Sequence, residues 1–81
     1  MEKTNNFHTS EYYLAISLLT LKENLIDIEK NNYSNRATFI FKQSPTLKKN
    51  IDDYRKGKLL IEPQALFMQH KLLKGRLYNN H

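Results

Sequence analysis

Hydrophobic residues are densest in the stretch 12–21, where all but two of ten positions are apolar. At about 100° per residue, these side chains cover most of a helix circumference. Thr9 or Ser10 offers a capping side chain, and Glu11 suits the positive end of a helix dipole. The pattern predicts a nearly buried helix from this cap to about Lys22. Because so short a chain buries little surface, we expect another chain to cover one flank.

The apolar rhythm then changes to a period of two. It is seen in residues 25–29, and again in residues 37–41, where Ala37, Phe39 and Phe41 share one face. An asparagine-rich segment, 31–35, separates the two stretches. Alternation on both sides of a turn-rich segment predicts a β-hairpin.

Helical spacing returns at Ser44-Pro45, a typical helix start with a capping hydroxyl and a proline in the first turn. Gly57 suits the left-handed position after the last turn. The buried stripe of this helix is predicted to consist of Leu47, Ile51 and Tyr54.

The remaining sequence predicts a short extended segment at 58–61, as an edge strand, and a third helix from Pro63 to about Leu77. We expect Phe67 and Met68 to widen the inner face of that helix. The core of that face is expected to be Leu66, Gln69 or His70, Leu73 and Leu77.

These elements predict an α+β fold, in which a β-hairpin or a three-stranded antiparallel sheet packs with three helices in the order α-β-β-α-(β)-α. The chain of 81 residues is expected to form one domain, 1–81, with residues 1–6 and 79–81 frayed. It has no cysteine, and its amino terminus lacks the apolar run of a signal peptide. Its longest apolar stretch is also too short to cross a membrane. A cytoplasmic location is therefore expected.

The net charge of +5 is unevenly distributed. Residues 1–41 contain four basic and five acidic residues, whereas residues 42–81 contain nine basic and three acidic residues. Such asymmetry favours an anionic partner, usually a nucleic acid. Lysines that only solubilise the domain are the alternative.

Catalytic machinery is not evident. His70 has no histidine or carboxylate three or four residues away, as a helical metal site would need. Two glycines are too few for a phosphate-cradling loop, and no serine follows the pattern of a nucleophile elbow. We therefore predict no catalytic residue, no metal site and no cofactor, and hence no enzyme acting alone.

The basic residues fall into two groups. On the second helix, Lys48, Lys49 and Lys56 have acidic partners four residues away. The chain after Pro63 carries bases but no acid. Lysines beside aromatic rings are typical of single-stranded nucleic-acid binding, although a solvated face would look similar. The candidate nucleic-acid-binding residues are Arg55, Lys58, Lys71, Lys74, Arg76 and Tyr78.

The apolar excess of the first helix indicates a protein interface. Tyr13, Leu14 and Leu21 are the candidate partner-binding residues. A homo-oligomer is also compatible with this pattern.

Six segments along the chain are distinctive in their order: Phe7-His8-Thr9-Ser10-Glu11-Tyr12-Tyr13-Leu14-Ala15, Thr38-Phe39-Ile40-Phe41, Ser44-Pro45-Thr46-Leu47, Asp53-Tyr54-Arg55-Lys56-Gly57, Glu62-Pro63 and Arg76-Leu77-Tyr78-Asn79. In these segments the chain resembles a family of small domains of unknown function from phages and mobile elements of Gram-positive bacteria. It is also similar to the small middle proteins of staphylococcal cassette chromosomes, which join an A-family DNA polymerase to form a primase.

This resemblance implies a non-catalytic accessory subunit of a replication complex, with an A-family DNA polymerase-like protein and single-stranded DNA as partners. Catalytic carboxylates would then belong to the polymerase. The alternative is a free-standing interaction module, such as a phage inhibitor of a host factor, which would be homodimeric and without DNA affinity.

Overall fold

The computed structural model describes residues 6–30 and 36–79. The predicted turn at 31–35 lies outside the described residues, and so do the predicted frayed ends, 1–6 and 79–81, except for Asn6 and Asn79, the last residue of α3. In chain order the elements are β1 (Phe7–Thr9), α1 (Tyr12–Thr20), β2 (Leu25–Lys30), β3 (Ala37–Phe41), α2 (Pro45–Arg55) and α3 (Pro63–Asn79).

The three strands form one antiparallel sheet in the order β1-β3-β2. Phe39 of the central strand lies opposite Thr9 on one side and Ile28 on the other. A register shift between Leu25 and Asp27 interrupts the β2–β3 ladder. The predicted α+β class, with three helices and a three-stranded antiparallel sheet, is confirmed.

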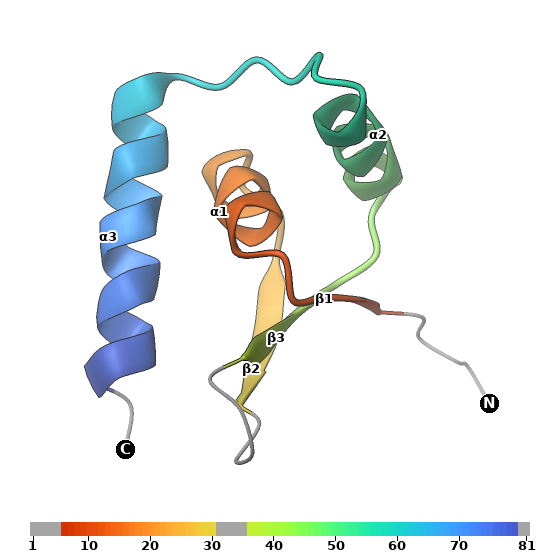
Figure 1. Cartoon of the computed structure of the whole chain (residues 1–81). Helices are drawn as coiled ribbons and strands as arrows, with labels where there is room; N and C mark the ends of the chain where they lie inside the picture. Colours follow the sequence, from red (N-terminus) through yellow and green to blue (C-terminus); the bar gives the residue numbers. More distant parts are fainter. Residues whose placement is uncertain (1–5, 31–35, 80–81) are drawn as a thin grey trace, which may run out of the picture.

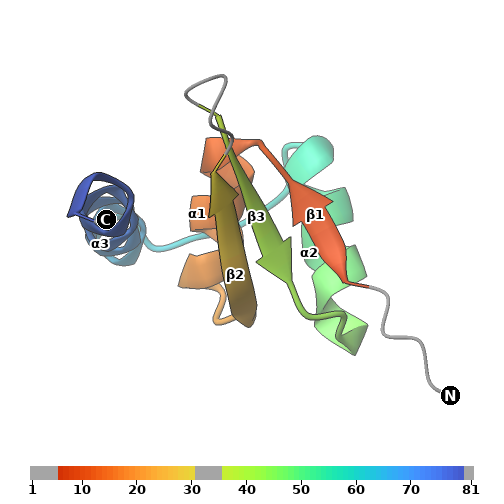
Figure 2. The ribbon, with the colours of Figure 1, turned by 90° about the horizontal axis from the view of Figure 1, so that it is seen from below.

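One face of the sheet is covered by α1, which lies between α2 and α3 (Figures 1 and 2). No helix among the described residues covers the opposite face (Figure 2). The apolar core forms where the inner faces of these elements meet. It consists of Leu14, Ala15, Ile16, Leu18, Phe39, Phe41, Leu47 and Leu73.

The first helix is as buried as its sequence predicts. Five consecutive residues, 14–18, are buried, because the sheet, α2 and α3 surround α1. The expectation that another chain covers one flank is therefore wrong for most of this helix. Leu14 is a particular correction, since it is 0% exposed and offers no surface to a partner.

The beginning of the chain also differs from the prediction. Residues 7–9 form β1 rather than the start of a helix, and pair with β3. The Oγ1 of Thr9 accepts a hydrogen bond from the backbone N–H of Glu11 at 3.1 Å, just before α1 begins. Three residues are too few to show a two-residue rhythm, so only pairing with β3 identifies this strand.

The second helix is built as expected. Its N-cap is Ser44, whose Oγ accepts a hydrogen bond from the backbone N–H of Leu47 at 3.1 Å. Pro45 occupies the first turn, and Gly57 follows the helix with a φ of +72°. Tyr54 packs against the core, which confirms its place in the apolar stripe.

The connection to α3 corrects two further expectations. Residues 58–61 are not a strand, and Leu60 is 90% exposed. The carboxylate of Glu62 instead accepts hydrogen bonds from the first free N–H groups of α3. Phe67 and Met68 are exposed and do not widen the inner face, which consists of Leu66, His70, Leu73 and Leu77.

Candidate functional site

The first turn of α1 is where the two outer helices meet the central one. The hydroxyl of Tyr12 lies 3.0 Å from Nδ1 of His70 on α3, and the two rings meet edge to face. Glu11, one residue earlier, forms an ion pair of 3.3 Å with Arg55 at the end of α2. Residues far apart in the sequence are thereby brought together at the N-terminal end of α1.

An exposed group of rings and lysines adjoins this junction. We call it the aromatic–basic surface; its members are Tyr13 of α1 and Phe67, Lys71, Lys74 and Tyr78 of α3. The four α3 residues are spaced by four, three and four, so they share one flank of the helix. Tyr13 is included because its ring contacts that of Tyr12 at a centroid distance of 5.6 Å, and Tyr12 in turn contacts His70 of α3.

The chemistry of this surface combines fixed charge with exposed π faces. The Nζ of Lys74 lies 5.9 Å from the centroid of the Tyr78 ring. Tyr13 and Tyr78 are 68% and 73% exposed, so both rings remain available to a ligand. Lysines can meet phosphates here while the rings stack on bases.

Tyr12, at the edge of the aromatic–basic surface, has a raised pKa. Burial, followed by the neighbouring Tyr13 and Tyr78 hydroxyls, raises the pKa of the Tyr12 phenol above its ordinary value near 10. Tyr12 is therefore a neutral hydrogen-bonding group at physiological pH.

The structure separates the six predicted nucleic-acid-binding residues. Lys71, Lys74 and Tyr78 come together on the aromatic–basic surface. Arg76 follows Lys74 by two residues, and the helical rotation of about 100° per residue places it on the other flank of α3. Arg55 is paired with Glu11, and Lys58 lies exposed in the connection beyond α2.

The predicted partner-binding residues do not form one surface. Tyr13 is exposed in the first turn of α1, whereas Leu21 is half-buried at the C-cap of the same helix. Leu14 lies in the core. Phe67, by contrast, belongs to the exposed surface but was assigned to the inner face of α3 by sequence reasoning; its spacing from Lys71, Lys74 and Tyr78 could have identified it.

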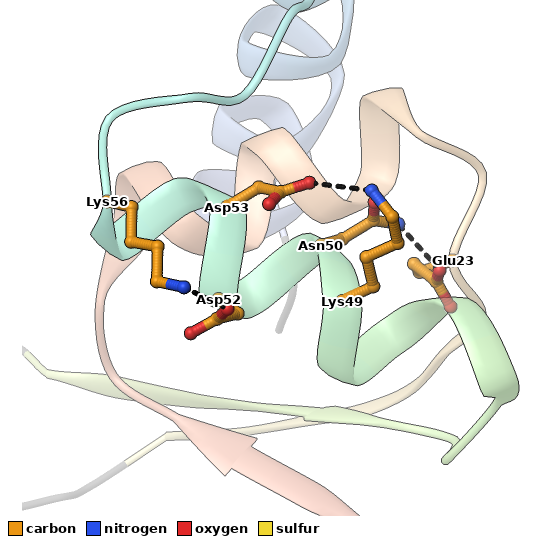
Figure 3. A network of polar contacts seen from close by, with 6 residues as sticks. All are labelled: Glu23, Lys49, Asn50, Asp52, Asp53 and Lys56. Atoms are coloured by element: carbon orange, nitrogen blue, oxygen red, sulfur yellow. Dashed lines mark hydrogen bonds and ion pairs between the residues drawn. The ribbon is translucent and has the colours of Figure 1, made fainter.

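A buried carboxylate, that of Glu23, is hydrogen-bonded to the start of α2, and this contact was not predicted from the sequence. Glu23 is 8% exposed and accepts hydrogen bonds from Ser44 Oγ at 2.8 Å, Thr46 Oγ1 at 2.6 Å and Asn50 Nδ2 at 2.9 Å. Its contact with Asn50 is drawn in Figure 3. Nothing in the local sequence distinguishes Glu23 from a surface acid, because its partners lie more than twenty residues later.

The exposed side of α2 pairs its own charges. Lys49 and Asp53 are 3.0 Å apart, as are Lys56 and Asp52 (Figure 3). The hydrogen bond to Asp52 raises the pKa of Lys56. The predicted pairing is thus confirmed for Lys49 and Lys56, whereas Asp52 pairs with Lys56 and not with Lys48.

Neither the requirements of a metal site nor those of a membrane-spanning helix are met in the part of the chain that the structure describes. Within residues 6–30 and 36–79, no three histidine or acidic side chains gather as metal ligands would. No helix among the same residues has the length and apolar character needed to span a bilayer.

Comparisons with known proteins give one match. The model of the family described as "Domain of unknown function (DUF5659)" matches residues 4–79. No curated protein and no solved structure shows significant similarity to the chain. Since the family model spans nearly the whole chain, the protein is a member of the DUF5659 family.

Proposed function

We propose that this protein is a non-catalytic accessory subunit of a mobile-element DNA replication complex and binds single-stranded DNA through its aromatic–basic surface. The observation that carries the DNA-binding role is the row on α3 in which Phe67 and Tyr78 flank Lys71 and Lys74, all exposed. The row extends from residue 67 to residue 78, which is roughly 16 Å along the helix. That length suits a few nucleotides of an extended strand.

The charge distribution supports the same role. Lys49 and Lys56 of the α2 region are paired with aspartates, whereas α3 contains no acidic residue between Pro63 and Asn79. Phosphate binding releases counterions and needs uncompensated positive charge. The favourable site for a strand is therefore α3 rather than α2, although both helices are rich in lysine.

The protein partner in this proposal rests on the sequence resemblance. An A-family DNA polymerase-like protein would supply the catalytic carboxylates and a second DNA-binding groove. A small domain with few phosphate contacts binds weakly alone, and linkage to a second site raises the overall affinity. Co-expression of the two proteins followed by size-exclusion chromatography tests this part, and separate elution at micromolar concentration would reject it.

The DNA-binding role is tested by fluorescence anisotropy of a labelled single-stranded oligonucleotide at several salt concentrations. Replacing Lys71 and Lys74 together by alanine should flatten the log–log salt dependence by about 1.4, or about 0.7 per lost phosphate contact. Phe67→Ala should weaken binding about 5- to 150-fold at every salt concentration, because one stacking contact is lost while the charge is unchanged.

A double alanine variant of Lys49 and Lys56 is the matched control, since it removes the same charge from two lysines that are each paired with an aspartate. It should leave the salt dependence nearly unchanged. If the α2 and α3 variants behave alike, only net charge matters and the aromatic–basic surface is not a site. A stable homodimer without DNA affinity would favour the alternative, a free-standing interaction module.

A further inference from the structure

A second face of α3 lies next to the aromatic–basic surface and points away from the core. Its residues, Ala65, Met68, Leu72 and Gly75, are spaced by three, four and three, the spacing of a helix–helix seam. Met68 and Leu72 are 57% and 54% exposed. We call these four residues the outer seam, because the inner stripe of the same helix faces the core.

Gly75 gives the outer seam a feature that the domain itself does not explain. It lies in the interior of α3, where glycine is less favourable than alanine. A Cβ atom added there would meet nothing within 4 Å, and the backbone is not left-handed. No contact within the described residues therefore requires glycine, whereas a helix that packs closely against the seam would benefit from its absent side chain.

The charges beside the outer seam indicate what covers it. Lys71 and Arg76 are exposed on its two sides, and α3 contains no acidic residue. Residues that flank a helical seam select the partner through interhelical ion pairs. A second copy of α3 would bring only basic side chains to the edges of the shared interface, so a self-association is disfavoured.

We propose that the outer seam of α3 docks an amphipathic α-helix of a partner protein, with acidic residues beside the apolar stripe of that helix. Met68 and Leu72 would pack into the stripe, Gly75 would permit close approach, and Lys71 and Arg76 would pair with the acids. The proposal deepens the accessory role proposed above and rests on it for the existence of a protein partner. It places that contact on α3 rather than on α1.

The probe is a labelled synthetic peptide with leucine at the seam-facing positions of a helix and glutamate beside them. A matched peptide carries lysine in place of each glutamate. The 81-residue chain should bind the glutamate peptide at least about tenfold more tightly than the lysine peptide. Leu72→Ser should weaken glutamate-peptide binding about tenfold or more, because a buried leucine contact is lost.

Leu60→Ser is the control variant, since Leu60 is 90% exposed and lies off the seam. It should leave peptide affinity unchanged within about twofold, a difference below the effect of one buried methylene. Gly75→Ala should keep or raise the thermal midpoint of the isolated chain, because alanine is the better helix former. A lowered midpoint would show that the fold itself needs glycine at this position, and Gly75 would then no longer support the docking of a partner helix.

Three results would overturn the proposal. Equal affinities for the two peptides would show that the seam does not select an acidic helix. An unchanged affinity of Leu72→Ser for the glutamate peptide would show that the peptide does not bind at the outer seam. A homodimer that Leu72→Ser dissociates would make a second copy the occupant. Single-stranded DNA binding by Leu72→Ser should equal that of the unmodified chain, so a failure of the DNA-binding role would be seen separately in the lysine variants of α3.

Discussion

The central helix α1 and the edge helix α3 are both rich in apolar side chains, but the domain covers them to different extents. α1 lies among the sheet, α2 and α3, and its residues 14–18 are all buried. α3 packs along one stripe against α1, and Phe67, Met68 and Leu72 remain exposed. The same kind of side chain is thus core in one helix and surface in the other.

The difference follows from position in a single helical layer. A central helix has neighbours on both flanks and a sheet beneath it, whereas an edge helix has one flanking helix (Figure 2). A domain of 81 residues has too little mass to cover both. The exposed apolar residues of α3 are therefore the basis of the binding surfaces proposed on that helix, while the greater apolar content of α1 reflects the core.

The largest test of this comparison exchanges one leucine in each helix for alanine. Leu14→Ala should lower the free energy of unfolding by about 2–5 kcal/mol, because it leaves a cavity in the core. Leu72→Ala should change it by no more than about 0.5 kcal/mol, since that side chain is half exposed. Urea denaturation of both variants measures the two values, and equal losses would show that α3 is packed as firmly as α1.

A smaller loss of unfolding free energy is expected when Glu23 is replaced, since its carboxylate joins the residues after α1 to the start of α2. Glu23→Ala should cost about 1–3 kcal/mol, because Ser44, Thr46 and Asn50 lose a buried acceptor. Asp52→Ala, which breaks an exposed ion pair, is the control and should cost no more than about 1 kcal/mol. Chemical denaturation at neutral pH compares them. A loss for Glu23→Ala no greater than that of the control would mean that apolar packing alone holds α2.

The smallest effect concerns the junction of the two helices. Tyr12→Phe removes the hydrogen bond to His70 and should cost about 0.5–1.5 kcal/mol at neutral pH. Because the folded-state pKa of Tyr12 is raised, its contribution is complete below the unfolded pKa near 10 and is lost as pH rises through the folded value. The thermal midpoint should therefore fall more steeply above pH 10 in the unmodified protein than in Tyr12→Phe.

Tyr13→Phe is the matched control for that measurement, since its ring is exposed in the next position. The thermal midpoint of Tyr13→Phe should still fall steeply at high pH, because Tyr12 remains partly buried in this variant. If the midpoint of Tyr12→Phe falls as steeply, the lysines of the domain account for the high-pH instability, and α1 and α3 are joined by apolar contacts only.

Some features of the fold follow directly from local pattern. The alternation in residues 37–41, the Ser44-Pro45 start and Gly57 all act within a few residues, so sequence reasoning predicts β3 and the bounds of α2. Features that depend on distant partners were predicted less well. The strand β1 exists because Phe7 and Thr9 pair with Phe41 and Phe39, more than twenty residues later.

The candidate site shows the same division. The spacing of Lys71, Lys74 and Tyr78 predicts a basic flank on one helix, and the absence of acids after Pro63 predicts that its charge is uncompensated. Phe67 belongs to this flank by its spacing of four from Lys71, whereas Tyr13 is brought near it by packing, because the contact of Tyr12 with His70 places α1 beside α3. Helical spacing alone could not decide whether Phe67 faces inward, since it lies at the margin of the apolar stripe. Met68 lies on the opposite side of the helix from that stripe, so its spacing already argued against an inward position.

The sequence by itself determined the α+β class, the amphipathic helices and the concentration of positive charge in the second half of the chain. These are properties of residue type and period, and they need no knowledge of neighbours. Only the tertiary structure decided which apolar helix is enclosed and which is left with an open face. That outcome depends on the order of the helices in the layer, where α1 lies between its two neighbours and α3 at the edge.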